Sequence, residues 1–275
     1  MTMARHRHSG QMAPGHSTRA IIGRAITPAA VLFVHEARNF FMSVFGYRKS
    51  WYLTAALSVV CGALGAAEEV NLLDRAPALF LMLEAILVIG TVAAIIISVD
   101  VMAGERERGG LLPLLLTPMS RGAIMMGKLG AAFAAWLATM TLSIPAIWAL
   151  SGAGMPWERS FTTLLLHATP LVIGFAALAL ALSASFERKR SALTASLALF
   201  AVLGGPLLFG AALGNSIGGR VLDAIDPVYA VAHVLRAIVI EKQAFLAQGF
   251  SVVTLVSFLT FALVFALFCS RRLSR

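Results

Sequence analysis

The chain has 275 residues, of which 59% are hydrophobic and only 13% are charged. Soluble globular domains carry about 25% charged residues, so this chain has too few charges to cover a water-exposed surface, and a soluble fold is excluded. The net charge of +9 does not indicate a nucleic-acid partner, because nucleic-acid binders gather Lys and Arg on one patch, whereas long apolar runs separate them here.

The first part of the chain is polar and basic. Residues 1–26 are rich in Gly, Ser and His, and we expect them to form a disordered cytoplasmic tail. Thr27 and Pro28 then suit the cap and first position of a helix over residues 27–48. Apolar residues recur at helical spacing in this segment: Phe33, Ala37, Phe40 and Val44. We predict an amphipathic helix lying in the membrane interface; a soluble helix packed on a neighbour is the alternative.

The rest of the chain, from residue 49 to 275, contains six long apolar runs and is predicted to form one all-α, polytopic membrane domain. A helix needs roughly 20 mostly apolar residues to cross a bilayer. The six predicted spans cover residues 51–67, 77–103, 124–149, 161–186, 192–213 and 250–270. Lys and Arg concentrate in cytoplasmic loops, and most of them fall on that side when both termini are placed in the cytoplasm.

An acidic residue lies inside the second predicted span. Glu84 is about 10 Å from the outer end of that span, at 1.5 Å per residue from Pro77. An ionisable group at this depth is by default a hypothesis for a functional site. Glu84 is therefore a candidate for a translocation path, and pairing with a polar group of another subunit is the alternative.

The cytoplasmic loop at residues 104–123 is unusual. It opens with alternating charges over residues 105–108, breaks at Gly109 and Gly110, and continues into a cluster of five leucines within residues 111–116. Ser120 then suits the cap of the next helix. An exposed apolar cluster in a cytoplasmic loop indicates a partner surface, although the leucines would also be explained by packing on the same subunit.

Another loop and an outer segment complete the pattern. Residues 186–190 form a short, mostly basic loop. In the outer segment 215–249, Asp226 and Pro227 are predicted to begin an amphipathic helix. Val231 and Leu235 lie on its apolar face, and Tyr229 and Arg236 lie on its polar face. This helix would serve either as an extracellular gate or as a passive surface helix.

The loop between the second and third spans resembles the signature of the type-2 ABC transporter permease family. The signature consists of Glu-x-Glu-x-Gly at residues 105–109, a leucine-rich stretch, Thr-Pro-Met-Ser-Arg at residues 117–121, and Gly-Lys entering the next span. In that family the loop is a coupling helix docked in a groove of a cytoplasmic ATPase. The resemblance implies this role for Glu105, Glu107, Gly109, Leu111, Leu115, Pro118, Gly127 and Lys128.

The resemblance also implies a function. The chain would be the non-catalytic permease subunit of a bacterial ABC exporter in the inner membrane, working with two ATPase subunits that bind ATP and Mg and with a second permease subunit, identical or homologous. Glu187, Arg188 and Arg190 would make a second contact with the ATPase, with a plain positive-inside anchor as the alternative. No cofactor or metal is expected on this chain.

Nucleotide binding by the chain itself is not expected, although Gly122 to Lys128 fits part of a phosphate-binding loop. Leu129 stands where that motif needs Ser or Thr to hold Mg, and no strand precedes it. The alternative function is an ATP-independent, ion-driven transporter. Such transporters usually show internal repeats and paired broken helices, and neither is evident in the sequence.

Overall fold

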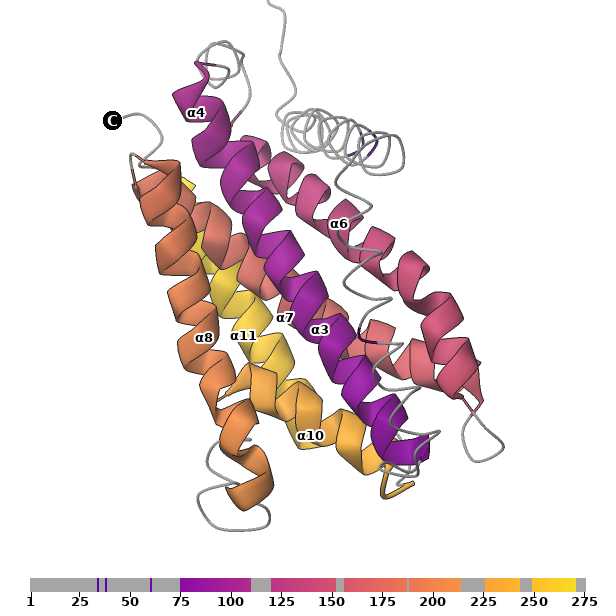
Figure 1. The fold of residues 1–275 in the computed structure, drawn as a ribbon. Coiled ribbons are helices and arrows are strands. Elements are labelled where there is room, and N and C mark those ends of the chain that lie inside the picture. The colour runs from indigo at the N-terminus through magenta and orange to yellow at the C-terminus, as the bar shows by residue number, and fades with distance from the viewer. Residues whose placement is uncertain are drawn as a thin grey trace, which may run out of the picture.

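The computed structural model describes the backbone of residues 75–109, 120–151, 156–186, 188–213, 226–242 and 249–270, together with Val34, Arg38 and Val60. Within these ranges, the surroundings of the side chains are described except at Arg75, 206–213 and 249–250. Every regular element in the described residues is a helix (Figure 1), which agrees with the predicted all-α class.

The helices form one elongated bundle (Figure 1). In chain order, the elements are α3 (Arg75–Val99), the π-helix η1 (Asp100–Gly104), α4 (Glu105–Glu107), α6 (Arg121–Leu150), α7 (Trp157–Ser185), α8 (Lys189–Leu213), α10 (Pro227–Val239) and α11 (Gly249–Cys269). The first three elements run on without a break, so that Ala76–Glu107 is one long apolar helix with a π-helical turn near its end.

Four helices among the described residues are long and apolar enough to cross a membrane: Ala76–Glu107, Arg121–Leu150, Trp157–Ser185 and Ser251–Cys269. They correspond to the second, third, fourth and sixth predicted spans. The fifth predicted span coincides with α8, a helix of 25 residues. The first predicted span, at residues 51–67, lies outside the described residues apart from Val60, so the count of six spans and the side of each terminus stay predictions.

The interfacial helix predicted over residues 27–48 also lies outside the described part of the chain, except for Val34 and Arg38. The same is true of the predicted tail at residues 1–26. Both segments stay predictions.

Helix α7 lies at the centre of the bundle, in contact with α3, α6, α8, α10 and α11. Helix α11, in contrast, packs with one side only. Its exposed large side chains are all apolar: Val252, Val253, Val256, Phe261, Val264, Phe265, Leu267 and Phe268. An outward face of this kind suits the hydrocarbon of a bilayer, because water would not solvate it.

Helices α6 and α7 begin slightly outside the apolar runs of the sequence. Ser120 accepts a hydrogen bond from the N–H of Ala123 over 3.2 Å, and α6 starts at the next residue, as predicted. Pro156 precedes α7, which starts before the first strongly apolar residues of the predicted span. Capping satisfies N–H groups that have no partner within the helix, so Ser120 sets the start of α6.

Helix α10 begins at the predicted cap. Asp226 Oδ1 accepts hydrogen bonds from the N–H groups of Val228 and Tyr229 over 2.9 and 3.4 Å. The helix packs against α3, α7, α8 and α11 at the end of the bundle away from α4 (Figure 1). Tyr229, on the polar side of the sequence pattern, is only 8% exposed. The polar face is therefore narrower than the sequence indicates, because neighbouring helices cover most of α10.

Candidate functional site

The residues of the loop signature that the structure describes gather at one end of the bundle. Here the end of the long helix Ala76–Glu107 meets the start of α6, the end of α7 and the start of α8 (Figure 1). The helix ends bring several charged side chains together. Their contacts define a site that we call the inner-end cluster, formed by Asp100, Glu105, Arg106, Glu107, Arg108, Lys128, Ser183 and Lys189.

Glu105 and Lys128 form an ion pair in this cluster. Lys128 Nζ donates a hydrogen bond to Glu105 Oε2 over 2.6 Å, and the lysine side chain is only 1% exposed. Removing an ammonium group from water is costly unless an anion compensates its charge. Glu105 supplies that anion from a position 23 residues earlier in the chain. Two residues of the sequence signature are thus partners in space.

Just before Glu105, the helix changes from α to π geometry over Asp100–Gly104. Ser183, from α7, contacts the backbone there. Its Oγ accepts a hydrogen bond from the N–H of Ala103 over 3.0 Å and donates one to the carbonyl of Val99 over 3.4 Å. A side chain that takes part in the backbone ladder is a recognised cause of such irregularity. π-helical turns are frequent at functional sites.

Asp100 joins this turn to the start of α8. Its Oδ1 accepts from Arg108 Nη2 over 2.9 Å and from Lys189 Nζ. Gly104 lies directly against this carboxylate, since a Cβ added at Gly104 would be 2.6 Å from Asp100 Oδ1. A larger residue at position 104 would therefore force the Asp100 side chain to shift.

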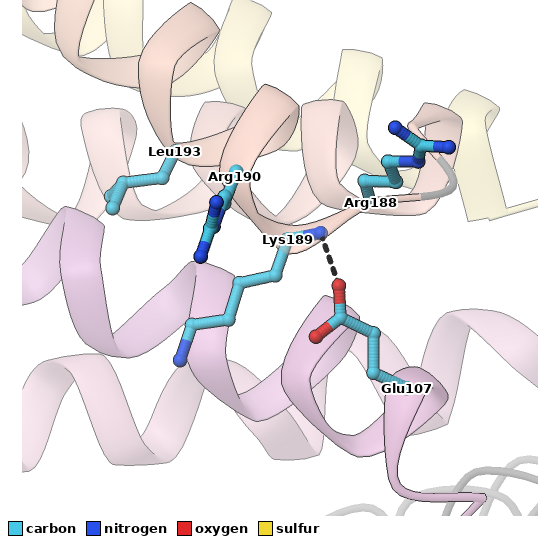
Figure 2. A pocket seen from close by; sticks show the side chains of 5 residues that line it. All are labelled: Glu107, Arg188, Lys189, Arg190 and Leu193. Atoms are coloured by element: carbon cyan, nitrogen blue, oxygen red, sulfur yellow. Dashed lines mark hydrogen bonds between the residues drawn. The ribbon is translucent and has the colours of Figure 1, made fainter.

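Arg106 and Glu107 reach the connection between α7 and α8. Arg106 donates hydrogen bonds to the carbonyls of Phe186 and Ala184, over 3.1 and 3.4 Å, at the end of α7. Glu107 Oε1 accepts the N–H of Lys189 over 2.8 Å, at the start of α8 (Figure 2). Cations near carbonyl ends and anions near amide ends of helices are favourable placements. Arg106 and Glu107 thus connect the end of the long helix to the end of α7 and the start of α8.

Some of the remaining predicted site residues lie within the described part of the chain and others lie outside it. Gly127 is buried in the first turns of α6, and Gly109 has a φ of 74°, a left-handed conformation that glycine adopts without strain. Leu111, Leu115, Pro118 and Glu187 lie outside the described residues, so the predicted docking surface for an ATPase is not described. Arg188 and Arg190, of the predicted second contact, are exposed beside the cluster.

Glu84 is remote from this cluster. At 1.5 Å per residue, it lies roughly 30 Å from Glu105 along the same helix. Its side chain is partly buried, and it interacts electrostatically with Arg236 of α10. The structure thus gives Glu84 a charged neighbour within its own chain. Among the described residues, no group of three or more His, Cys, Asp or Glu is placed to hold a metal ion.

Sequence reasoning did not find Ser183. A serine in an apolar helix usually bonds to a carbonyl of its own helix, as Ser185 does with Ala181. Nothing in the local pattern distinguishes the serine that reaches a neighbouring helix from the serine that does not. The charges at residues 105–108, in contrast, stood out because they interrupt an apolar chain.

Comparison with known protein families gives one result. The family model described as ABC-2 family transporter protein matches residues 19–275, which is nearly the whole chain. No curated protein matches this chain.

Proposed function

The chain belongs to the ABC-2 transporter family, a family of membrane permease components, and we propose from this that it is the permease subunit of a bacterial ABC exporter. In this proposal, a separate ATPase subunit binds ATP and Mg and hydrolyses the nucleotide. The permease forms one half of the export path, and a second permease subunit forms the other half. The substrate would be moved out of the cytoplasm.

The inner-end cluster is the observation that supports coupling to an ATPase. Loop 104–123 begins in the last turns of the long helix, which ends at Glu107, and continues into α6, which begins at Arg121. Glu105 ties its first end to α6 through Lys128, and Arg106 and Glu107 tie the same end to α7 and α8. Because these contacts join four helices, a displacement of the loop by a bound ATPase would be transmitted to the bundle as a whole.

In the same proposal, the leucines at residues 111–116 form the docking surface, with Leu111, Leu115 and Pro118 in the groove of the ATPase. Glu105, Glu107, Gly109, Gly127 and Lys128 hold that surface in position. Their role would be to orient and transmit, since the charged members already have partners within the chain. Glu84 is proposed to line the translocation path near the opposite end.

Co-purification tests this proposal. The full chain is purified gently from detergent-solubilised membranes, and the associated proteins are identified by mass spectrometry and assayed for ATPase activity. We expect an ATPase subunit to co-purify with the wild type and with Leu115→Met, a substitution that preserves volume and apolar character. We expect its loss with Leu115→Asp, because a charge would have to be buried in the docking groove.

Thermal unfolding of the isolated chain controls for misfolding and should be the same for all three proteins. Recovery of the folded wild type without any ATPase would contradict the proposal. That outcome would favour an ion-driven transporter, and Glu84 would then be the first residue to substitute.

A further inference from the structure

A cavity of about 600 Å³ lies at the start of α8, lined by Glu107, Arg188, Lys189, Arg190 and Leu193 (Figure 2). Three successive basic residues thus border one cavity. Figure 2 shows the side chains of Lys189 and Arg190 extending over the helix that carries Glu107, with Leu193 beside them, while Arg188 points to the other side of the turn.

The described residues around this cavity carry a net positive charge because of the two arginines. Lys189 pairs with Asp100, and the carboxylate of Glu107 accepts the N–H of Lys189. Asp100 also pairs with Arg108. Arg188 and Arg190 are exposed and form no ion pair with any of the described residues. An anion is therefore the complementary ligand for the cavity.

The position of the cavity indicates the source of that anion. It lies where an apolar helix of 25 residues begins, which is the level at which a membrane helix meets the headgroups of the bilayer. Leu193 adds an apolar side chain to the wall of the cavity, about one helical turn after Lys189 and Arg190 (Figure 2). The arrangement suits a molecule with an anionic head and an apolar tail.

We propose that this cavity binds the headgroup of an anionic phospholipid. Arg190 holds the phosphate, Arg188 adds attraction from the other rim, and the first carbons of an acyl chain lie along Leu193. Basic pockets at helix ends on one side of a membrane are known to recognise such headgroups. The proposal rests on the prediction that α8 spans the membrane and does not depend on ATP coupling. Under this proposal, Arg188 and Arg190 of the basic loop 186–190 bind a lipid and do not contact the ATPase.

Lipid titration of the purified full-length chain tests the proposal. Phosphatidylglycerol and phosphatidylcholine are added in parallel, bound lipids are counted by native mass spectrometry, and thermal unfolding is followed. The wild type should retain phosphatidylglycerol in preference to phosphatidylcholine. A single basic residue near a membrane surface contributes attraction equivalent to about fivefold in affinity. We therefore expect about fivefold weaker retention for Arg190→Gln and a further loss for Arg188→Gln/Arg190→Gln.

Matched variants separate this site from general charge. Arg121→Gln removes an exposed cation at the same end of the bundle, outside the cavity, and should retain phosphatidylglycerol as the wild type does. Arg190→Lys keeps the charge and should retain most of the preference. Inorganic phosphate should neither displace the lipid nor raise the unfolding temperature, since it lacks the apolar tail.

Three outcomes would overturn the proposal: equal retention of the two lipids, identical behaviour of Arg190→Gln and Arg121→Gln, or full competition by inorganic phosphate. Loss of a co-purifying ATPase from Arg190→Gln with unchanged lipid binding would also overturn it, in favour of a protein contact at this loop.

Discussion

Lys128 Nζ donates a hydrogen bond to Glu105 Oε2 over 2.6 Å, and this pair joins the start of α6 to the end of the long helix that begins at α3. The two partners differ in their surroundings, since the side chain of Lys128 is 1% exposed and that of Glu105 is 30% exposed. Water partly solvates the carboxylate but does not reach the ammonium group. The lysine therefore depends on the pair more than the glutamate does.

This asymmetry predicts unequal effects of breaking the pair. Glu105→Ala removes the carboxylate from a buried cation and should lower the free energy of unfolding by about 3 kcal/mol, the usual scale for breaking a buried pair. Lys128→Met leaves a carboxylate that water partly solvates, in a variant of similar volume, and should cost less. Chemical unfolding in detergent measures both. The double variant should be about as stable as Lys128→Met alone, and strictly additive losses would contradict the pairing.

The bond between Ser183 and the π-helical turn gives a second prediction. Ser183→Ala leaves the buried N–H of Ala103 without the acceptor it has in the structure, which should cost about 1–3 kcal/mol of stability. Ser185→Ala is the matched control, because Ser185 is exposed and bonds only to a carbonyl of its own helix in the described contacts. Thermal unfolding should separate the two variants clearly. Equal midpoints would show that Ser183 does not hold the turn.

Gly104 provides a third prediction. A methyl group at this position would be 2.6 Å from Asp100 Oδ1 and 3.2 Å from Arg108 Nη2. Gly104→Ala should therefore displace Asp100 from Lys189 and loosen the link between the π-helical turn and α8. Gly204→Ala is the control, since nothing lies within 4 Å of an added Cβ there and alanine favours a helix by up to about 1 kcal/mol.

The readout for Gly104→Ala is thermal unfolding together with cross-linking of cysteines introduced in place of Arg108 and Arg188, in a background without native cysteines. Gly104→Ala should lower both the midpoint and the cross-linking yield, whereas Gly204→Ala should leave both at or above the wild-type values. Unchanged cross-linking in Gly104→Ala would show that Asp100 accommodates the methyl group by a local shift.

Sequence reasoning predicted those features that depend on neighbouring residues. Long apolar runs located α3, α6, α7, α8 and α11, and Ser120 and Asp226 marked the starts of α6 and α10 because capping is a local interaction. The charges at residues 105–108 were recognised as functional candidates, but their partners were not. Which residue meets Glu105 is decided by the packing of α3 against α6, and neither helix carries that information in its own pattern.

The same reason explains the enclosure of α10. Its apolar periodicity predicted the helix correctly, yet the sequence placed Tyr229 on a polar surface. The number of neighbours around a helix depends on how other helices cross it, and here α3, α7, α8 and α11 all contact α10. Amphipathicity therefore indicated which side of α10 is apolar, while the width of its exposed side was set by tertiary packing.

Asp226 at the start of α10 predicts a dependence of stability on pH. Burial raises the pKa of the Asp226 carboxyl above its usual value of 3.8, although hydrogen bonds from the N–H groups of Val228 and Tyr229 oppose the shift. Its Oδ2 is buried without a hydrogen-bond partner among the described residues, in agreement with a site that disfavours the charged form. The folded state therefore binds this proton more tightly than the unfolded state does.

The sign of the effect follows from this difference. Below pH 3.8 the carboxyl is protonated in both states and ionisation carries no penalty; as the pH rises from there through the raised pKa of the folded state, the free energy of unfolding falls. Asp226→Asn keeps the capping oxygen but cannot ionise. Over that pH interval the free energy of unfolding of the wild type should therefore fall relative to that of Asp226→Asn. Asp226→Ala loses the cap and should cost about 1 kcal/mol while the wild-type carboxyl is protonated, and this cost should shrink over the same pH interval because alanine cannot ionise either. Chemical unfolding of the three proteins between pH 4 and neutral pH measures these free energies. If the free energies of unfolding of the wild type and Asp226→Asn changed with pH in parallel, the carboxylate would be as well stabilised in the folded protein as in water, which would contradict the prediction.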